Sequence, residues 1–117
     1  MILNLADVSE RIADWPRTVA VAAPGASGLA AVRSLQAGNV RLRVVEYAPG
    51  YLADHWCSKG HILYVVAGAL AIEHEDGAPA HRLAAGMGWY VSDGQVPAHR
   101  VRCEQGATVF IVDALPG

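Results

Sequence analysis

The feature that most constrains this chain's fold is a series of short apolar segments with a two-residue repeat, separated by glycine, proline and aspartate turns. The clearest is VRLRVVEY, residues 40–47, in which Val40 and the apolar residues at every second position after it share one face. Arg41 and Arg43 fall on the opposite face. A period of two is typical of a strand with one buried side. We therefore expect a strand here with its arginines outward.

Further segments of this kind follow, and turn signals such as Pro49-Gly50 and Asp93-Gly94 separate them. They span residues 61–68, 69–75, 87–91, 99–103 and 107–113. This spacing, without any strand–helix–strand repeat, predicts an all-β fold, a small antiparallel β-barrel or jelly roll.

Helical signal is confined to residues 7–14, where Asp7 or Ser9 would cap a short N-terminal helical turn and Pro16 would close it. The 117 residues are enough for one domain. We expect a single domain over 1–117, with a core barrel at about 38–113 and an N-terminal extension over 1–37.

Composition and charge exclude several partners. A net charge of −2, with arginines scattered along the chain, argues against nucleic acid binding. No apolar run approaches the roughly 18 residues that cross a bilayer, and the N-terminal residues do not form a secretory signal. We expect a cytoplasmic protein without a membrane partner, in which Cys57 and Cys103 are thiols.

The stretch DHWCSKGH, residues 54–61, concentrates metal-ligand side chains in an otherwise apolar chain. On an extended strand His55 and Cys57 would share a face, and a bend at Gly60 would let His61 approach the same point. In HRVRC, residues 99–103, outward arginines imply an inward His99. These four side chains, His55, Cys57, His61 and His99, are our predicted metal ligands.

An alternative for the histidines is that each satisfies a hydrogen bond in the core instead of binding a metal. Cys103 and Glu46 are two further residues that could lie near the site. Cys103 shares the face of His99 but would lie about 13 Å along the strand, so a role as a small buried residue is expected for it. Glu46 would be a carboxylate near the ion, a general base, if the alternation of 40–47 holds, but a slip at Val44-Val45 would turn it outward.

At these positions the chain resembles the cupins, small β-barrels of the jelly-roll class. The first cupin motif has a glycine, two histidines one residue apart, a glutamate three or four residues later and a glycine after six more. Here Gly50 precedes His55, and Cys57 stands in place of the second histidine. His61 stands in place of the glutamate, with six residues before Gly68.

The second cupin motif is matched by Gly86 and His99, although the loop over residues 92–98 departs from the family. The stretches VEYAPGYLADHWCSKGHI, DGQVPAH and ATVFIVD resemble a subgroup of short bacterial cupins, the DHCW-motif proteins, over about residues 38–113. The resemblance implies a divalent metal inside the barrel and often a homodimer, for which an outward Trp56 would be a contact. It does not imply a reaction, because cupins include enzymes, storage proteins and sugar-sensing regulators.

Thiolate and imidazole ligands favour zinc, with nickel, copper or iron(II) as competitors. Four protein ligands around zinc would make a closed, structural site, whereas a catalytic site needs an open position. If Cys57 stands back from the ion, its thiol becomes a candidate nucleophile or redox group. The sequence therefore favours a metal-dependent enzyme acting on a small organic molecule in the barrel. The alternatives are a non-catalytic small-ligand or metal sensor and a structural metal site in a dimeric barrel.

Overall fold

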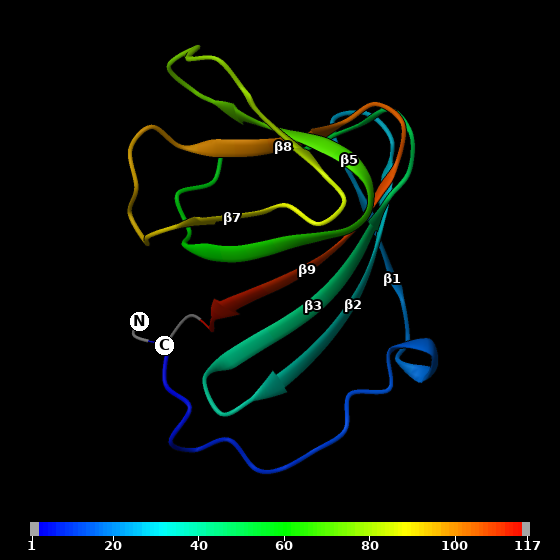
Figure 1. Ribbon diagram of the computed structural model, residues 1–117, viewed down its shortest axis with the longest axis vertical. Helices are drawn as coiled ribbons and strands as arrows, with labels where there is room; N and C mark the ends of the chain where they lie inside the picture. The colour runs from blue at the N-terminus through cyan, green and yellow to red at the C-terminus, as the bar shows by residue number, and fades with distance from the viewer. Residues whose placement is uncertain (1–2, 116–117) are drawn as a thin grey trace.

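The computed structural model describes residues 3–115 as a curled antiparallel sheet, a half-barrel with one short helical turn (Figure 1). The sheet runs in the order β1-β2-β3-β9-β5-β8-β4, and β6 and β7 both pair with β5. The elements are η1 (Trp15–Arg17), β1 (Val21–Pro24), β2 (Leu29–Ala37), β3 (Val40–Tyr47), β4 (Tyr51–Leu52), β5 (His61–His74), β6 (His81–Ala84), β7 (Gly88–Val91), β8 (His99–Cys103) and β9 (Ala107–Ala114). The all-β prediction is confirmed.

Strand β5 joins the two walls of the half-barrel. The sequence suggested two strands, 61–68 and 69–75, but the chain continues through Gly68 as one strand of 14 residues. The first part of β5 pairs with β7 and β9, and the second part pairs with β6 and β8. Gly68 has a φ of 76°, and a Cβ there would lie 2.3 Å from the carbonyl oxygen of Gly106. Only glycine permits this bend and close approach of backbones.

The expected facing of β3 is wrong. Val45 is 3% exposed on the inner face, and Arg41 and Arg43 lie on that same face and line an internal cavity. The reason is Asp113 of β9, a fully buried carboxylate that accepts hydrogen bonds from both arginines. A buried ion pair thus overrides the simple rule that the charged face of a strand points to water.

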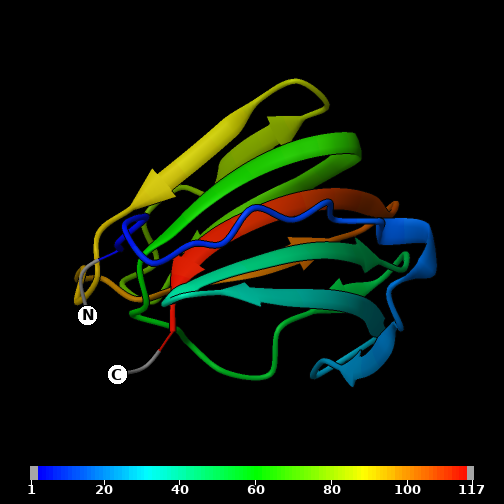
Figure 2. The ribbon, with the colours of Figure 1, turned by 90° about the horizontal axis from the view of Figure 1, so that it is seen from below.

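The outer face of β9 is partly covered by the N-terminal segment, which runs in front of this strand in Figure 2. The Trp15 ring centroid lies 6.1 Å from that of Phe110 on β9, and the backbone N–H of Asn4 donates to Asn39 Oδ1 at 3.0 Å. The helical turn is real but lies at Trp15–Arg17 rather than 7–14, with Pro16 inside it. Proline is favoured in a first helical turn because its φ is already suitable.

Two further points concern the extent and core of the barrel. Strand β1 begins at Val21 and β2 at Leu29, so the sheet starts well before residue 38. Val65, Ile72, Val109 and Cys103 are its most deeply buried side chains, which agrees with the role expected for Cys103. No helix within residues 3–115 is long and apolar enough to span a membrane.

Candidate metal centre

Three of the predicted ligands meet at one point inside the half-barrel. The ligand atoms of Cys57, His61 and His99 all lie within 4.8 Å of one another. Cys57 Sγ is 3.8 Å from His61 Nε2. They come from the loop before β5, the first residue of β5 and the first residue of β8.

Backbone pairing places Cys57 beside His99. The two residues form an isolated antiparallel bridge, with N–H to O distances of 2.8 and 2.9 Å in the two directions. Directly opposed residues of an antiparallel pair have their side chains on the same side of the sheet. The backbone N–H of Lys59 also donates to Cys57 Sγ at 3.4 Å. The thiol is therefore held by main-chain geometry.

A buried carboxylate orients His61. Its Nδ1–H donates to Asp113 Oδ2 at 2.8 Å, which leaves Nε2 as the free nitrogen on the side of Cys57. Burial alone would raise the pKa of Asp113, but hydrogen bonds from His61 and Arg41 and the charges of both Arg43 and Arg41 lower it well below its ordinary value. Asp113 is thus an anion that fixes the imidazole tautomer, the arrangement common behind metal-binding histidines.

Sequence reasoning did not identify Asp113 as part of the site. A signal was present, because in ATVFIVD it follows Val109 and Ile111 at the same two-residue interval. An acid on the buried face of an apolar strand needs a partner.

His99 is buried without a partner. It is 5% exposed, and neither ring nitrogen has a hydrogen-bond partner in the described part of the chain. Its ring centroid lies 5.3 Å from that of His61 and 4.8 Å from that of Trp89. Burial, together with His61 and His74, lowers the pKa of His99 to about 4. A neutral imidazole with unsatisfied nitrogens is costly to bury, and coordination of a cation would satisfy one of them.

The donor set therefore fits a divalent cation: one soft thiol sulfur and two imidazoles, of which one has a carboxylate behind it and the other lacks a hydrogen-bond partner. The alternative that the histidines only satisfy core hydrogen bonds does not account for His99.

His55 lies outside this group. Its side chain is 76% exposed, and its Nδ1 is 2.7 Å from Asp54 Oδ1. The chain bends at residues 54 and 55 instead of running as an extended strand, so the same-face argument does not apply there. His55 nevertheless lines the same cavity as the other three residues.

Glu46 lies on the outer face of β3, where it forms an ion pair with Arg33 of β2. Its side chain is about half exposed and does not line the cavity. The alternation of 40–47 holds without a slip at Val44-Val45, and Glu46 points outward because Arg41, Arg43 and Val45 take the inward positions.

The cavity beside the three ligands has a volume of about 320 Å³. The pattern of the sequence also predicts a mostly apolar pocket lined by Leu63, Val65, Trp89, Val91 and Val101. Leu63, Trp89 and Val101 do line this cavity, whereas Val65 is fully buried in the core and Val91 lines a different pocket. The apolar and aromatic part of the wall consists of Tyr47, Tyr51, Ala53, Leu63, Trp89, Val101 and Ile111.

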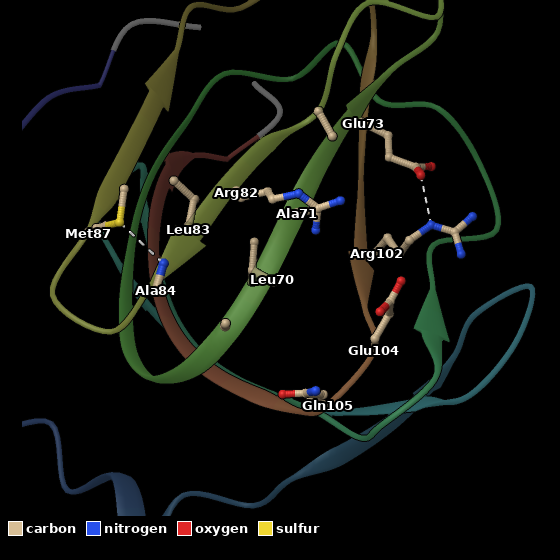
Figure 3. Close-up of a pocket in the computed structure, with 12 residues that line it drawn as sticks. Leu70, Ala71, Glu73, Arg82, Leu83, Ala84, Met87, Arg102, Glu104 and Gln105 are labelled. Atoms are coloured by element: carbon tan, nitrogen blue, oxygen red, sulfur yellow. Dashed lines mark hydrogen bonds and ion pairs between the residues drawn. The ribbon is translucent and has the colours of Figure 1, made fainter.

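A second cavity of about 350 Å³ lies against β5, β6 and β8 (Figure 3). Glu73 there accepts hydrogen bonds from Arg102 at 2.7 Å and from Arg100 at 2.9 Å. None of its lining residues belongs to the Cys57, His61 and His99 group. We therefore place the candidate site in the first cavity.

Comparison with known proteins gives the fold its context. No family model matches the sequence, and no curated protein matches it significantly. Among solved structures, the polyketide cyclase RemF from Streptomyces resistomycificus superposes with a TM-score of 0.76 at 19% identity, covering 92% of this chain and 81% of that one.

An RmlC-like cupin from Shewanella frigidimarina superposes with a TM-score of 0.69 at 18% identity, over 94% of this chain and 95% of that one. A protein described as a predicted oxalate decarboxylase, from Thermotoga maritima, gives a TM-score of 0.73 at 13% identity, over 91% and 100%. At these identities the likeness concerns the fold. The chain has the fold of the small single-domain cupins.

Proposed function

We propose that this protein binds one divalent metal ion through Cys57, His61 and His99, and that the resulting centre acts on a small organic molecule in the adjacent cavity. The observation that carries the proposal is the convergence of three donor atoms within 4.8 Å, one of them from a buried histidine that has no hydrogen-bond partner within residues 3–115. Zinc is the metal we favour, with nickel, copper and iron(II) as competitors for the same ligands.

The chain's own residues prepare this centre. Asp113 holds His61 in the tautomer that presents Nε2, and the bridge between Cys57 and His99 fixes the other two donors. When bound, a divalent ion would supply Lewis acidity toward an oxygen atom of the ligand. Solved structures of similar fold include the polyketide cyclase and the predicted oxalate decarboxylase, which is consistent with an enzymatic role.

His55 decides between an open and a closed centre. Its exposure and its hydrogen bond to Asp54 support a position outside the inner ligand group, which would leave one site for a ligand. If His55 swings inward as a fourth ligand, the centre becomes closed and structural. A sensor that binds its ligand without reacting would share the open geometry, so turnover distinguishes it from an enzyme.

The experiment is zinc titration of the chelator-treated protein, with fluorescence competition to measure affinity. The proposal predicts one equivalent of zinc, bound at least about tenfold more weakly by His99→Ala and His61→Ala. His81→Ala is the matched control because His81 is exposed and outside the cavity. Equal affinity in wild type and His99→Ala would overturn the proposal. Loss of affinity in His55→Ala would identify a closed site.

A second candidate function is thiol chemistry without metal. Cys57 Sγ, His61 Nε2 and Asp113 form a series of nucleophile, base and orienting carboxylate, with separations of 3.8 and 2.8 Å. Such a series activates a thiol when the distance between Cys57 Sγ and His61 Nε2 shortens to hydrogen-bond length on substrate binding. The two functions exclude each other at one time, because a metal-bound sulfur is not a free nucleophile.

We also propose a homodimer. The Trp56 ring, which the sequence suggests as a dimer contact, already packs against Arg100, whose guanidinium carbon lies 4.1 Å from the ring centroid. The outer face of β5 and β7 offers a larger apolar surface, formed by Ile62, Tyr64, Val66 and Tyr90, each about half or more exposed. Light scattering at micromolar concentration should give a dimer, and Tyr64→Glu a monomer. A wild-type monomer would refute this.

A further inference from the structure

The wall of the cavity beside the candidate metal centre carries two inward arginines. Arg41 and Arg43, from neighbouring inward positions on β3, line the cavity together with Cys57, His61 and His99. Their side chains are 25% and 19% exposed. The nearest negative charge is Asp113, which accepts from Arg41 Nε at 2.7 Å and Nη2 at 2.9 Å and from Arg43 Nη2 at 2.9 Å. Two cations thus share one carboxylate.

Arg43 is the less satisfied of the two. Asp113 takes one of its N–H groups, and its buried Nε has no hydrogen-bond partner among the residues that the structure describes. Burial and then the adjacent Arg41 charge lower the pKa of Arg43, and the hydrogen bond and charge of Asp113 offset only part of this. A guanidinium offers five N–H donors in a planar fork that matches a carboxylate.

The rest of the cavity does not supply the missing charge. Within residues 3–115, no aspartate or glutamate lines this cavity, and Lys59 adds a further cation to it. Arg100 also lines it, but Glu73 already binds its guanidinium. The remaining wall is apolar and aromatic: the Tyr47 and Tyr51 ring centroids lie 4.8 Å apart, and Trp89 faces the same space. A ligand that fits must combine a negative group with an apolar body.

We propose that the cavity binds a small organic carboxylate, whose charged group is bound by Arg43 and Arg41 and whose apolar body packs against Trp89 and the tyrosines. A monoanion suits the single positive charge that the arginine pair retains beside Asp113. This names the substrate class of the centre proposed above and rests on that function for its catalytic meaning. Binding of the anion itself requires the arginines and not the metal.

The test uses the chelator-treated, metal-free protein and two probes of equal shape, benzoate and benzamide, measured by calorimetry at low ionic strength. Benzoate should bind at least about tenfold more tightly than benzamide. Arg43→Gln should remove that preference, and Arg43→Lys, which keeps the charge beside Asp113, should retain part of it. Arg33→Gln is the matched control, because Arg33 lies on the next strand and outside this cavity.

Equal binding of benzoate and benzamide by the wild type would overturn the proposal. An unchanged preference in both folded Arg43 variants would do the same, and tighter binding of phenyl phosphate than of benzoate would contradict the carboxylate assignment. The outcome is separable from that of zinc titration. Benzoate binding without zinc binding would remove the proposed function and keep the anion site, and the reverse result would remove only the anion site.

Discussion

Acidification of the metal-free protein should cost stability through one residue, His99. The folded chain holds this imidazole at a pKa of about 4, mainly because it is buried and also because His61 and His74 lie beside it. In the unfolded chain its pKa returns to about 6.5. Between these values the unfolded state binds a proton that the folded state does not. The contribution of His99 to stability is therefore complete above about pH 6.5 and is lost as the pH falls toward 4.

The magnitude follows from the two pKa values. Lowering the pH from about 7.5 to about 5 should reduce the free energy of unfolding by about 2 kcal/mol through His99 alone. The assay is urea unfolding in the presence of chelator at both pH values, for the wild type and for His99→Gln. His61, His74 and Asp113 remain in both proteins, so the difference between the two losses reports His99.

The wild type should lose about 2 kcal/mol more than His99→Gln over this interval. Equal losses would refute the reasoning, since they would mean that His99 is not held neutral by its surroundings. With saturating zinc present, the wild type should also resist acid better than without it, because a coordinated nitrogen has no free lone pair to protonate.

Three further predictions concern individual residues. Asp113→Asn should weaken zinc binding by roughly 10- to 100-fold in titration, because the carboxylate that orients His61 is lost; an unchanged affinity would contradict the role of Asp113. Gly68→Ala should destabilise the protein by more than about 2 kcal/mol in urea unfolding, since β5 passes too close to Gly106 for a side chain; a neutral effect would show that the bend can relax. Iodoacetamide should modify Cys57 and not the buried Cys103 in the native metal-free protein, and zinc should protect Cys57; mass spectrometry showing no protection would argue for the metal-free thiol.

Local patterns were sufficient for most strands. VRLRVVEY and HRVRC become β3 and β8 with the predicted bounds, because both are short alternating segments closed by turns. The unbroken β5 could not be read in the same way, since Gly68 is equally a signal for a turn and for a bend within a strand. The reversed facing of β3 depends on Asp113, which is 70 residues or more away in sequence from its arginine partners.

In the candidate site, too, residues that depend on nearby sequence could be predicted, and residues that depend on contacts with distant strands could not. His61 could be assigned to the candidate site because it begins an apolar segment, and His99 because the arginines that alternate with it implied an inward histidine. Cys57 could be added because it lies four residues before His61. The position of His55 was missed because the argument assumed an extended chain where the backbone bends. Arg41 and Arg43 were assigned to solvent because period-two reasoning compares hydrophobicity along one strand and cannot include a buried partner on another.

X-ray absorption at the zinc edge, on protein loaded with one equivalent of zinc, tests the central claim most directly. The account predicts one sulfur neighbour at about 2.3 Å and two imidazole nitrogens at about 2.0–2.1 Å, with the sulfur signal lost in Cys57→Ser. A zinc environment of nitrogen and oxygen alone, unchanged in Cys57→Ser and in His99→Ala, would contradict it.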